Sequence, residues 1–276
     1  MRWLVTGGRG MFGTDLVLLL QERGEDVVAV GSAECDIRSL DAVRDTMRDF
    51  DVVVNAAAWT AVDDAESHEP EAFAINATGA RNVALVAAET GARMVHISTD
   101  YVFDGTATEP YAPDHPQAPR SAYGRTKAAG EWAIRTTNPD ALIVRTAWLY
   151  GEHGPNFVKT MQRLAGQHDT LNVVDDQIGQ PTWTKDLAAY VVELVTSGKP
   201  GGYYHGTSDG TTTWCGFTRE IFRLSGWDPE RVKPCTTADF PRPAPRPALS
   251  VLRHDAGPAV RRWDAALAEY LVACDH

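Results

Sequence analysis

Apolar runs and helical patterns alternate along the first 150 residues. Short, nearly continuous apolar runs predict a strand at the N-terminus and further strands at residues 26–30, 51–58, 93–99 and 141–151. Between the strands, apolar residues recur at the spacing of a helix face, which predicts helices at 11–23, 39–49, 69–90 and 121–137. Strands that are apolar throughout and alternate with helices are typical of a parallel sheet buried on both faces. The pattern therefore predicts a Rossmann-type, doubly wound α/β domain over residues 1–150.

The pattern changes after residue 150. Helices are expected at 156–167, 184–197 and 258–273, and short strands at 171–174 and 202–206. We interpret residues 151–276 as a smaller, mostly substrate-binding region that is partly interleaved with the first domain.

Composition and charge narrow the class of protein. The 276 residues are 43% hydrophobic and 23% charged, as in an ordinary globular chain, and the net charge of −11 disfavours a nucleic-acid groove. Met1 leads directly into a predicted strand, and no apolar run approaches the ~20 residues that cross a bilayer. We therefore expect a cytoplasmic protein with no membrane or nucleic-acid partner.

Cysteine and histidine spacing gives no metal motif. The four cysteines, at 35, 215, 235 and 274, form no CxxC pair, and the eight histidines form no HExxH. We expect reduced thiols and no protein-bound metal.

The glycine-rich stretch "GGRGMFG" lies between the first strand and the first helix. Its glycines at 7, 10 and 13 form a Gly-x-x-Gly-x-x-Gly pattern. The first glycines permit a sharp turn and let a diphosphate approach backbone N–H groups, and Gly13 lets the helix pack closely on the strand. The helix N-terminus also favours phosphate. The stretch predicts a dinucleotide site.

Two features bear on which dinucleotide binds. The end of the second strand reads Gly31-Ser32, without the acidic residue that holds a free ribose 2′-hydroxyl. The guanidinium of Arg9 can pair with a 2′-phosphate, or it is simply a solvated loop charge. These features favour NADPH and leave NADH possible.

The expected strand ends locate the site. Ligands of such sheets bind beyond the carboxyl ends of the strands. We expect one cleft where four ends converge, namely Gly7–Gly10, Ala56–Trp59, Ser98–Tyr101 and Thr146–Leu149.

The stretch "YGRTK" places Tyr123 and Lys127 four residues apart, on one face of the expected helix. A lysine lying over a tyrosine ring on an ordinary helix face gives the same spacing. A phenol of pKa ~10 transfers protons slowly at neutral pH unless a nearby ammonium stabilises the phenolate. A hydroxyl of Ser98 or Thr99, at a strand end, can polarise a carbonyl oxygen. Beside a dinucleotide site, this set predicts a carbonyl reductase.

The chain resembles the extended short-chain dehydrogenase/reductases, which carry this glycine loop and a Tyr-x-x-x-Lys pair. More closely, it resembles the dTDP-4-dehydrorhamnose reductase family. The similar stretches occur in order along most of the chain: "NAAAWTAVDDAE" (55–66), "INAT" (75–78), "HISTDYVFDG" (96–105), "YGRTKAAGE" (123–131), "RTAWLYG" (145–151), "NFVKTM" (156–161), "DDQIGQPTW" (175–183), "GTTTW" (210–214) and "RPALSVL" (246–252).

This resemblance implies an oxidoreductase of deoxysugar biosynthesis. It implies NAD(P)H-dependent reduction of the C4 ketone of a dTDP-4-dehydro-6-deoxyhexose, either dTDP-4-dehydro-L-rhamnose or a related deoxysugar. A monomer or a homodimer is expected. The glycine loop also resembles that of GDP-fucose synthase, an NADPH enzyme of the same superfamily.

The resemblance also implies site residues. The catalytic residues are Thr99, Tyr123 and Lys127, with Tyr123 as the acid and Lys127 also bonding the nicotinamide ribose. The cofactor-binding residues are Gly7, Arg9, Gly10, Met11, Phe12, Gly13, Ser32, Asp36, Ile37, Ala56, Ala57, Ala58, Tyr123 and Lys127. The substrate-binding residues are Thr99, Asp100, Tyr101, Trp148, Asn156, Trp214 and Arg246.

Other interpretations remain at this stage. Trp148 and Trp214 are alternatively core aromatics, and Arg246 a solvated loop charge. A nucleotide-sugar epimerase with tightly held NAD⁺ uses the same Tyr-Lys pair, but the missing acid after the second strand argues against it. A non-catalytic subunit, like the regulatory subunit of methionine adenosyltransferase, is disfavoured by the intact Thr99, Tyr123 and Lys127.

Overall fold

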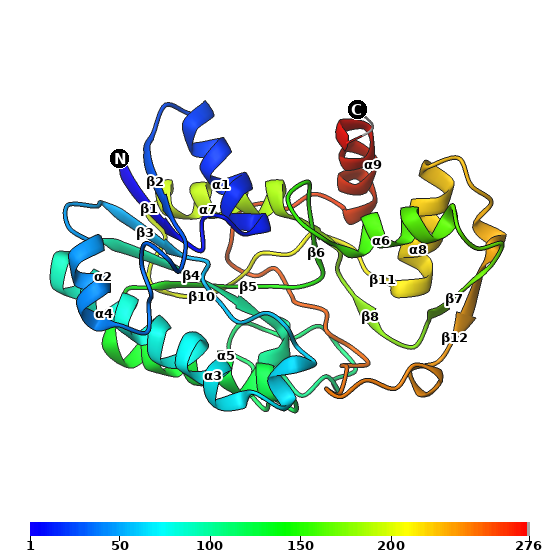
Figure 1. Ribbon diagram of the computed structural model, residues 1–276, viewed down its shortest axis with the longest axis horizontal. Helices are drawn as coiled ribbons and strands as arrows, with labels where there is room; N and C mark the ends of the chain where they lie inside the picture. The colour runs from blue at the N-terminus through cyan, green and yellow to red at the C-terminus, as the bar shows by residue number, and fades with distance from the viewer. Residues whose placement is uncertain (275–276) are drawn as a thin grey trace.

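A six-stranded parallel sheet is the main sheet of the molecule (Figure 1), whose residues 1–274 we describe from a computed structural model. The strand order is β10-β5-β4-β3-β1-β2. The bounds are β1 (Arg2–Thr6), β2 (Asp26–Val30), β3 (Val52–Asn55), β4 (Arg93–Thr99), β5 (Leu142–Thr146) and β10 (Gly202–His205). The order reverses between β1 and β3, which creates the switch point where ligands of such sheets bind. The predicted doubly wound α/β fold is confirmed.

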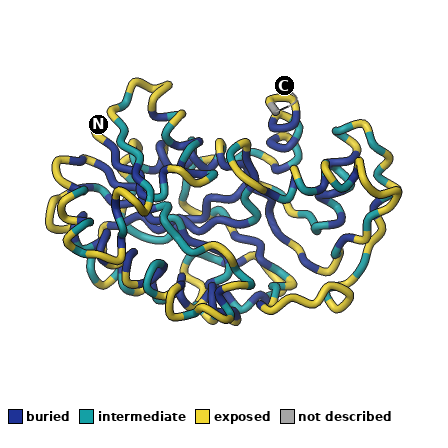
Figure 2. The backbone as a smooth tube through the Cα atoms, in the orientation of Figure 1, coloured by how far each residue is buried: buried dark blue, intermediate teal, exposed yellow. Residues whose placement is uncertain are grey.

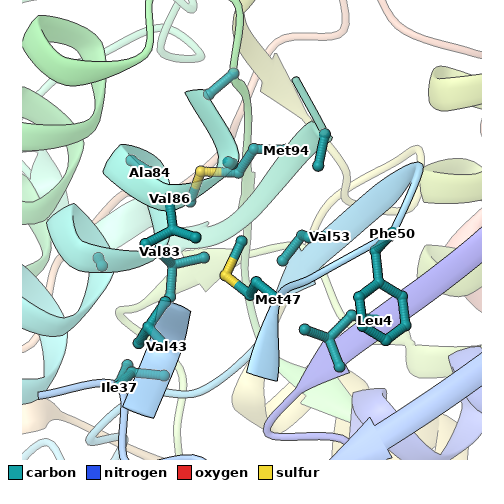
Figure 3. Packing of buried hydrophobic residues seen from close by; sticks show 14 of the residues in the cluster. Leu4, Ile37, Val43, Met47, Phe50, Val53, Val83, Ala84, Val86 and Met94 are labelled. Carbon is teal, nitrogen blue, oxygen red and sulfur yellow. The ribbon is translucent and has the colours of Figure 1, made fainter. Parts of the chain in front are cut away.

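Helices cover both faces of this sheet because alternate strand residues carry apolar side chains to each face. On one face, Leu4, Val53 and Met94 pack against α2 (Leu40–Thr46), α4 (Ala80–Thr90) and α5 (Ala122–Thr137) (Figure 3). On the other face, α1 (Met11–Glu22) and α7 (Thr184–Thr196) pack against the intervening strand residues. Both faces of the sheet are therefore covered by helices, and a ligand can reach the sheet only at the strand ends.

The single helix expected at 69–90 is interrupted in the structure. It consists of α3 (Glu69–Phe73), a π-helical turn at Ala74–Gly79, and α4. In that turn Asn76 accepts a hydrogen bond from the Trp59 backbone N–H, at 2.8 Å, and donates to the Thr126 hydroxyl, at 3.0 Å. The widened turn ties the loop after β3 to α5, and a periodicity argument does not detect it.

The second region has short strands and its own core. Three two-stranded sheets pair β6 (Leu149–Tyr150) with β9 (Thr182–Trp183), β7 (Leu171–Val174) with β12 (Val232–Cys235), and β8 (Ile178–Gly179) with β11 (Thr212–Thr213). They pack with α6 (Phe157–Ala165), α8 (Trp214–Leu224) and α9 (Trp263–Cys274) around buried aromatic and aliphatic side chains. Single 3-10 turns lie at η1 (Asp64–Glu66), η3 (Asp100–Val102), η4 (Pro229–Arg231) and η5 (Thr237–Asp239). Figure 2 shows buried central strands and a mostly exposed segment that follows β12.

Three sequence-based predictions need correction. The strand expected at 141–151 breaks after Thr146, because Trp148 adopts a left-handed conformation with φ of 47°. The helix expected at 258–273 begins only at Trp263, because the preceding backbone forms a bridge between Asp209 and Arg262. The strand expected at 202–206 is β10, which pairs with β5 in the main sheet and not with the short strands.

The chain crosses more than once between the main sheet and the second region. After β6 it builds α6, β7, β8 and β9, returns to the sheet for α7 and β10, and then builds β11, α8 and α9. A domain boundary near residue 150 stays a prediction. A single cut there would separate α7 and β10 from the sheet that they complete. Across residues 1–274, no helix has the length and apolar character needed to span a membrane.

Candidate active site

A cleft of about 770 Å³ lies at the carboxyl ends of β1, β3, β4 and β5. Its lining includes Gly7 after β1, Ala56–Ala58 after β3, Ser98–Tyr101 at the end of β4, and Thr146–Leu149 after β5. The structure therefore brings the four expected strand ends to one place. The pair β1 and β3 flanks the point where the strand order reverses.

Two glycines of the loop at this cleft have no room for a side chain. Gly7 has φ of 68°, and a Cβ atom there would lie 2.6 Å from the backbone nitrogen of Ala57. A Cβ on Gly13 would lie 2.4 Å from the carbonyl oxygen of Gly7. Helix α1 begins at Met11, and its N-cap, Gly10, has no side chain to cap the first-turn N–H groups. Backbone donors at a side-chain-free helix N-terminus suit a diphosphate, so the residues present fit a dinucleotide.

The segment that follows β2 also lines this cleft. Ser32, Asp36 and Ile37 line it, as does Arg38, which sequence reasoning missed. The Arg38 guanidinium donates to both carboxylate oxygens of Asp36, at 2.9 and 2.7 Å. This contact lowers the pKa of Asp36, so the carboxylate stays ionised.

Arg9 is not among the residues that line the cleft, although it lies against Gly31, which does line it. Its guanidinium forms an ion pair with Glu34, and the Arg9 side chain is 69% exposed. The Glu34 carboxylate also accepts the Gly31 backbone N–H, at 3.0 Å. Sequence reasoning found no acid directly after β2, yet this glutamate, three residues beyond Gly31, folds back onto the strand end. Sequence reasoning could have found Glu34 as an acidic residue four positions after the end of β2.

Tyr123 and Thr99 lie next to each other in the cleft lining. Ser121 caps α5 by accepting the Gly124 N–H, so Tyr123 lies in the first turn of the helix. Burial raises the pKa of Tyr123 above its usual range, and the hydrogen bond with the Thr99 hydroxyl opposes that rise. The ring of Tyr101 packs edge-on against Tyr123 with centroids 5.6 Å apart. Tyr123 is therefore a neutral phenol at neutral pH.

Asp100 lies beside this pair. The Thr99 hydroxyl donates to its Oδ1 at 2.9 Å, and Asp100 is buried. Burial raises the pKa of Asp100 to about 6, so its charge changes close to neutral pH.

Lys127 is buried one helical turn after Tyr123, with 1% of the residue exposed. Its Nζ donates to the Ile97 carbonyl at 2.7 Å and lies 3.2 Å from His96 Nε2. Burial lowers the pKa of Lys127 to about 8, and the negative charge of Glu131 opposes this shift. A snorkelling surface lysine is therefore excluded.

Ser98 and Thr99 point to opposite sides of β4, because successive strand residues alternate. The Ser98 hydroxyl donates to Glu131, which is buried and paired with Arg145 at 2.7 Å. Ser98 is thus engaged by this buried ion pair, whereas the Thr99 hydroxyl lies at Tyr123. Of the two hydroxyls left open by the sequence, the geometry favours Thr99.

The two tryptophans form a stack at the second region's side of the cleft. Trp148 lines the cleft, and Trp214 lies on it with centroids 3.6 Å apart and planes 9° apart. Trp214 also packs on Phe157 and donates its indole N–H to Gln177 at 3.1 Å. Trp214 is not among the residues that line the cleft, so it reaches the cleft only through Trp148.

Asn156 and Arg246 also lie outside the cleft lining. Asn156 caps α6 by accepting the Lys159 N–H at 3.0 Å, and its amide donates to the Gly151 carbonyl at 2.6 Å. Arg246 pairs with Asp63 at 2.8 Å and is 19% exposed, so it is not a solvated loop charge. It lines a small adjoining cavity that shares Tyr101 with the main cleft.

Histidine, cysteine and acidic side chains are dispersed over the described residues. Within residues 1–274, no group of three His, Cys, Asp or Glu side chains is arranged to hold a metal ion. Cys35, Cys215 and Cys235 are free thiols.

Comparisons with known proteins agree with this geometry. The profile of the RmlD substrate binding domain matches residues 1–275. A dTDP-4-dehydrorhamnose reductase of Streptomyces griseus is 49% identical, over 97% of this chain and 92% of the relative. A dTDP-4-keto-6-deoxy-D-glucose reductase of Streptomyces niveus is 48% identical, over 97% of this chain and 96% of the relative.

A solved structure extends the likeness to three dimensions. The dTDP-4-dehydrorhamnose reductase of Bacillus anthracis, crystallised with NADP, superposes with a TM-score of 0.94 and 35% identity, and the match covers 99% of each chain.

Proposed function

The chain belongs to the RmlD substrate binding domain family, and from this membership we propose that it is an NADPH-dependent ketoreductase of dTDP-sugars. It would convert the C4 ketone of a dTDP-4-dehydro-6-deoxyhexose to the alcohol. The observation that carries the proposal is one cleft that holds Thr99, Tyr123 and Lys127 together with a glycine loop fitted to a diphosphate.

Cofactor binding falls to the β1, β2 and β3 ends. Gly7, Gly10, Met11 and Phe12 would hold the diphosphate with backbone groups, and Ser32, Asp36 and Ile37 line the part of the cleft nearest β2. When bound, the nicotinamide cofactor supplies the reducing electrons. The NADP in the Bacillus anthracis structure supports NADPH as the preferred form.

The side chains of this protein manage the oxygen of the ketone. The Thr99 hydroxyl, now bonded to Asp100, can turn to donate to that oxygen and polarise it. The O–H bond of Tyr123 then breaks as the O–H bond of the alcohol forms, which leaves a phenolate. The ammonium of Lys127, one turn along α5, stabilises that phenolate, and a proton from water restores the phenol.

The hexose is assigned as a class of sugar. The two named Streptomyces relatives differ in the sugar that their names give, a 4-dehydrorhamnose and a 4-keto-6-deoxyglucose. Both names share a dTDP-linked 6-deoxy sugar with a ketone at C4, and we assign that class here. Tyr101 and Trp148, which line the cleft beside Tyr123, are the side chains best placed to contact the sugar.

Product analysis tests the function directly. The protein is incubated with NADPH and dTDP-4-keto-6-deoxyglucose, with and without a 3,5-epimerase, and the product is identified by NMR. A C4 alcohol formed only with the epimerase assigns the rhamnose precursor as substrate, and one formed without it assigns the unepimerised sugar. If the absorbance of NADPH falls in neither mixture, the proposal is refuted.

The epimerase alternative has its own signature. An epimerase holds NAD⁺ tightly, so purified protein would release NAD⁺ on denaturation and would interconvert sugars without net consumption of NADPH. The reductase names of both relatives favour the ketoreductase.

Location and assembly complete the proposal. Free thiols at Cys35, Cys215 and Cys235 suit a reducing compartment such as the cytoplasm. A monomer or a homodimer stays a prediction, which sedimentation would decide.

A further inference from the structure

A row of buried polar residues crosses three neighbouring strands behind the cleft. Thr6 on β1 is the register partner of Asn55 on β3, and Asn55 is the register partner of His96 on β4. Register partners on parallel strands place their side chains on the same face of the sheet. Here that face is the one covered by α5, and all three residues are at most 1% exposed.

Hydrogen bonds join this row to the catalytic lysine. The Thr6 hydroxyl lies 2.7 Å from Asn55 Oδ1, and Asn55 Nδ2 lies 3.1 Å from His96 Nδ1. His96 Nε2 lies 3.2 Å from Lys127 Nζ. An unbroken chain of contacts therefore runs from the base of the glycine loop to the lysine beside Tyr123.

Two tautomers of the neutral imidazole are possible, and an ammonium at Lys127 is compatible with only one of them. A neutral imidazole has one N–H and one lone pair. If Asn55 donates to Nδ1, as drawn in the structure, the imidazole proton is on Nε2 and donates to Lys127, which must then be a neutral amine. If Lys127 is an ammonium it donates to Nε2, so Nδ1–H must donate to the Asn55 oxygen and the amide must be turned over. The Thr6 hydroxyl can meet either end of the amide, because it both donates and accepts.

A third arrangement, with a charged imidazole, is disfavoured. His96 is completely buried, and both that burial and the charge of Lys127 lower the pKa of His96. The amide orientation of an asparagine is assigned from its hydrogen bonds, so the two arrangements differ only in proton positions and one amide turn.

We propose that the Thr6–Asn55–His96 row is a positioning device that switches its hydrogen-bond direction with the charge of Lys127. His96 changes tautomer as Lys127 gains or loses its proton, and so gives a partner to both forms of a buried lysine. The imidazole lone pair stabilises the ammonium that the reaction needs. The consequence for turnover rests on the proposed function, whereas the switch itself does not.

The other groups around Lys127 are accounted for. On α5 itself lie Tyr123 and Glu131, and Glu131 is held by Arg145 from β5. Asp100, on η3, contributes a negative charge that raises the pKa of Tyr123.

The elements packed along the start of α5 contribute carboxylates that are already bonded elsewhere. Glu66 of η1 accepts the Ala122 N–H, and Glu69 of α3 pairs with Arg125. Asn76 of the π-helical turn is uncharged and bonds Thr126. His96 is thus the switchable neighbour of Lys127 among the described residues.

Nitrogen NMR of the wild-type protein tests the switch without any assay of activity. Histidines are labelled with ¹⁵N, and the His96 signals are identified by their loss in His96→Gln. We expect Nε2 to be the unprotonated nitrogen at low pH and the protonated one at high pH, with one midpoint shared by both nitrogens. In Lys127→Met the tautomer should not change with pH.

Two results would overturn the proposal. One is a His96 that keeps the same tautomer across the titration of Lys127 in the wild type. The other is a His96 with both nitrogens protonated at low pH. Either result leaves the assignment of ketoreductase activity untouched.

pH profiles of kcat then measure the effect on turnover. His96→Leu removes the lone pair that favours the ammonium, so the alkaline limb should move about one pH unit toward acid. His96→Gln keeps an acceptor and should recover much of that shift. The matched control is His205→Gln, which changes a buried histidine on β10 whose Nδ1 contacts the Arg253 carbonyl outside the row.

An unchanged alkaline limb in a folded His96→Leu, checked by near-UV circular dichroism, would contradict the proposal. A shift of equal size in His205→Gln would contradict it too. If His96→Leu does not fold, the NMR titration of the wild type still decides.

Discussion

The two sides of the cleft hold their side chains by different means. On the sheet side, Thr99 ends a seven-residue strand, and Lys127 is clamped between the Ile97 carbonyl and His96. On the side of the second region, Trp214 and Arg246 are held by a stacked ring and an ion pair, next to strands of two residues. A continuous sheet fixes the first group through many backbone bonds, whereas the second group is held by contacts between side chains.

This difference separates two tasks. Proton transfer requires atoms held within a narrow range of positions, which the buried strand ends supply. Recognition of a large nucleotide-sugar requires side chains that can rearrange around it. The ion pair of Arg246 with Asp63 illustrates this, because a diphosphate can replace the carboxylate as partner.

The largest expected effect is on the sheet side. Tyr123→Phe removes the proton donor and keeps the ring, so kcat should fall by at least about 100-fold. Binding of NADPH, followed by fluorescence titration, should be unchanged because the glycine loop is untouched. Turnover close to wild type would remove Tyr123 from the chemistry.

The next largest effect is expected for Arg246, on the side of the second region. Arg246→Ala should raise KM for the dTDP-sugar about tenfold, as for the loss of a hydrogen bond to a charged group. Arg246→Lys should recover only part, because an ammonium cannot make two parallel bonds. KM for NADPH should stay constant.

Arg242 supplies the matched control for that measurement. It lies 3.8 Å from the same Asp63 carboxylate but is 58% exposed, so Arg242→Ala should have little effect. Equal rises in the two variants would point to general loss of positive charge, and no rise in Arg246→Ala would exclude this residue from substrate binding.

Asn156 tests whether a cap also serves the substrate. Asn156→Ala should lower the free energy of unfolding by about 1 kcal/mol, the usual contribution of an N-cap. Since the side chain points to the backbone of α6 and Gly151, KM for the dTDP-sugar should not change. Thermal unfolding and steady-state kinetics on the same sample measure both, and a KM rise without loss of stability would restore Asn156 to the binding site.

The smallest effect is expected at Arg9. Because this side chain is mostly exposed and already paired with Glu34, Arg9→Ala should raise KM for NADPH by only about threefold. KM for NADH should not move, since NADH has no 2′-phosphate. Arg38→Ala is the comparison variant, because Arg38 lines the cleft. If Arg9→Ala raises KM equally for NADPH and NADH, Arg9 is a solvated loop charge only.

Sequence reasoning was strongest where the fold itself imposes position. The apolar strands were visible as such, and a parallel sheet brings their ends together, so Gly7, Ala56 and Thr99 could be placed in one cleft. The spacing of Tyr123 and Lys127 needed only a helix. None of these inferences required knowledge of a loop.

The features that sequence reasoning did not predict depend on contacts between distant parts of the chain. The ion pair of Arg246 with Asp63 joins residues 183 positions apart, and nothing in either local sequence indicates it. His96 begins the stretch at residues 96–105, and nothing in that stretch predicts a role for it, because its contacts follow from its register with Asn55. The left-handed backbone of Trp148 likewise follows from packing and not from residue type.

The return of the chain to the main sheet has a consequence for synthesis on the ribosome. Strand β10 forms the sheet edge next to β5, and α7 covers α1 and one sheet face. A nascent chain that has reached residue 150 therefore leaves β5 as an open edge and α1 partly uncovered, which favours association with other chains. Only when residue 205 has emerged can the sheet be completed, so the cleft matures late in translation although every proposed catalytic residue has been made by residue 127.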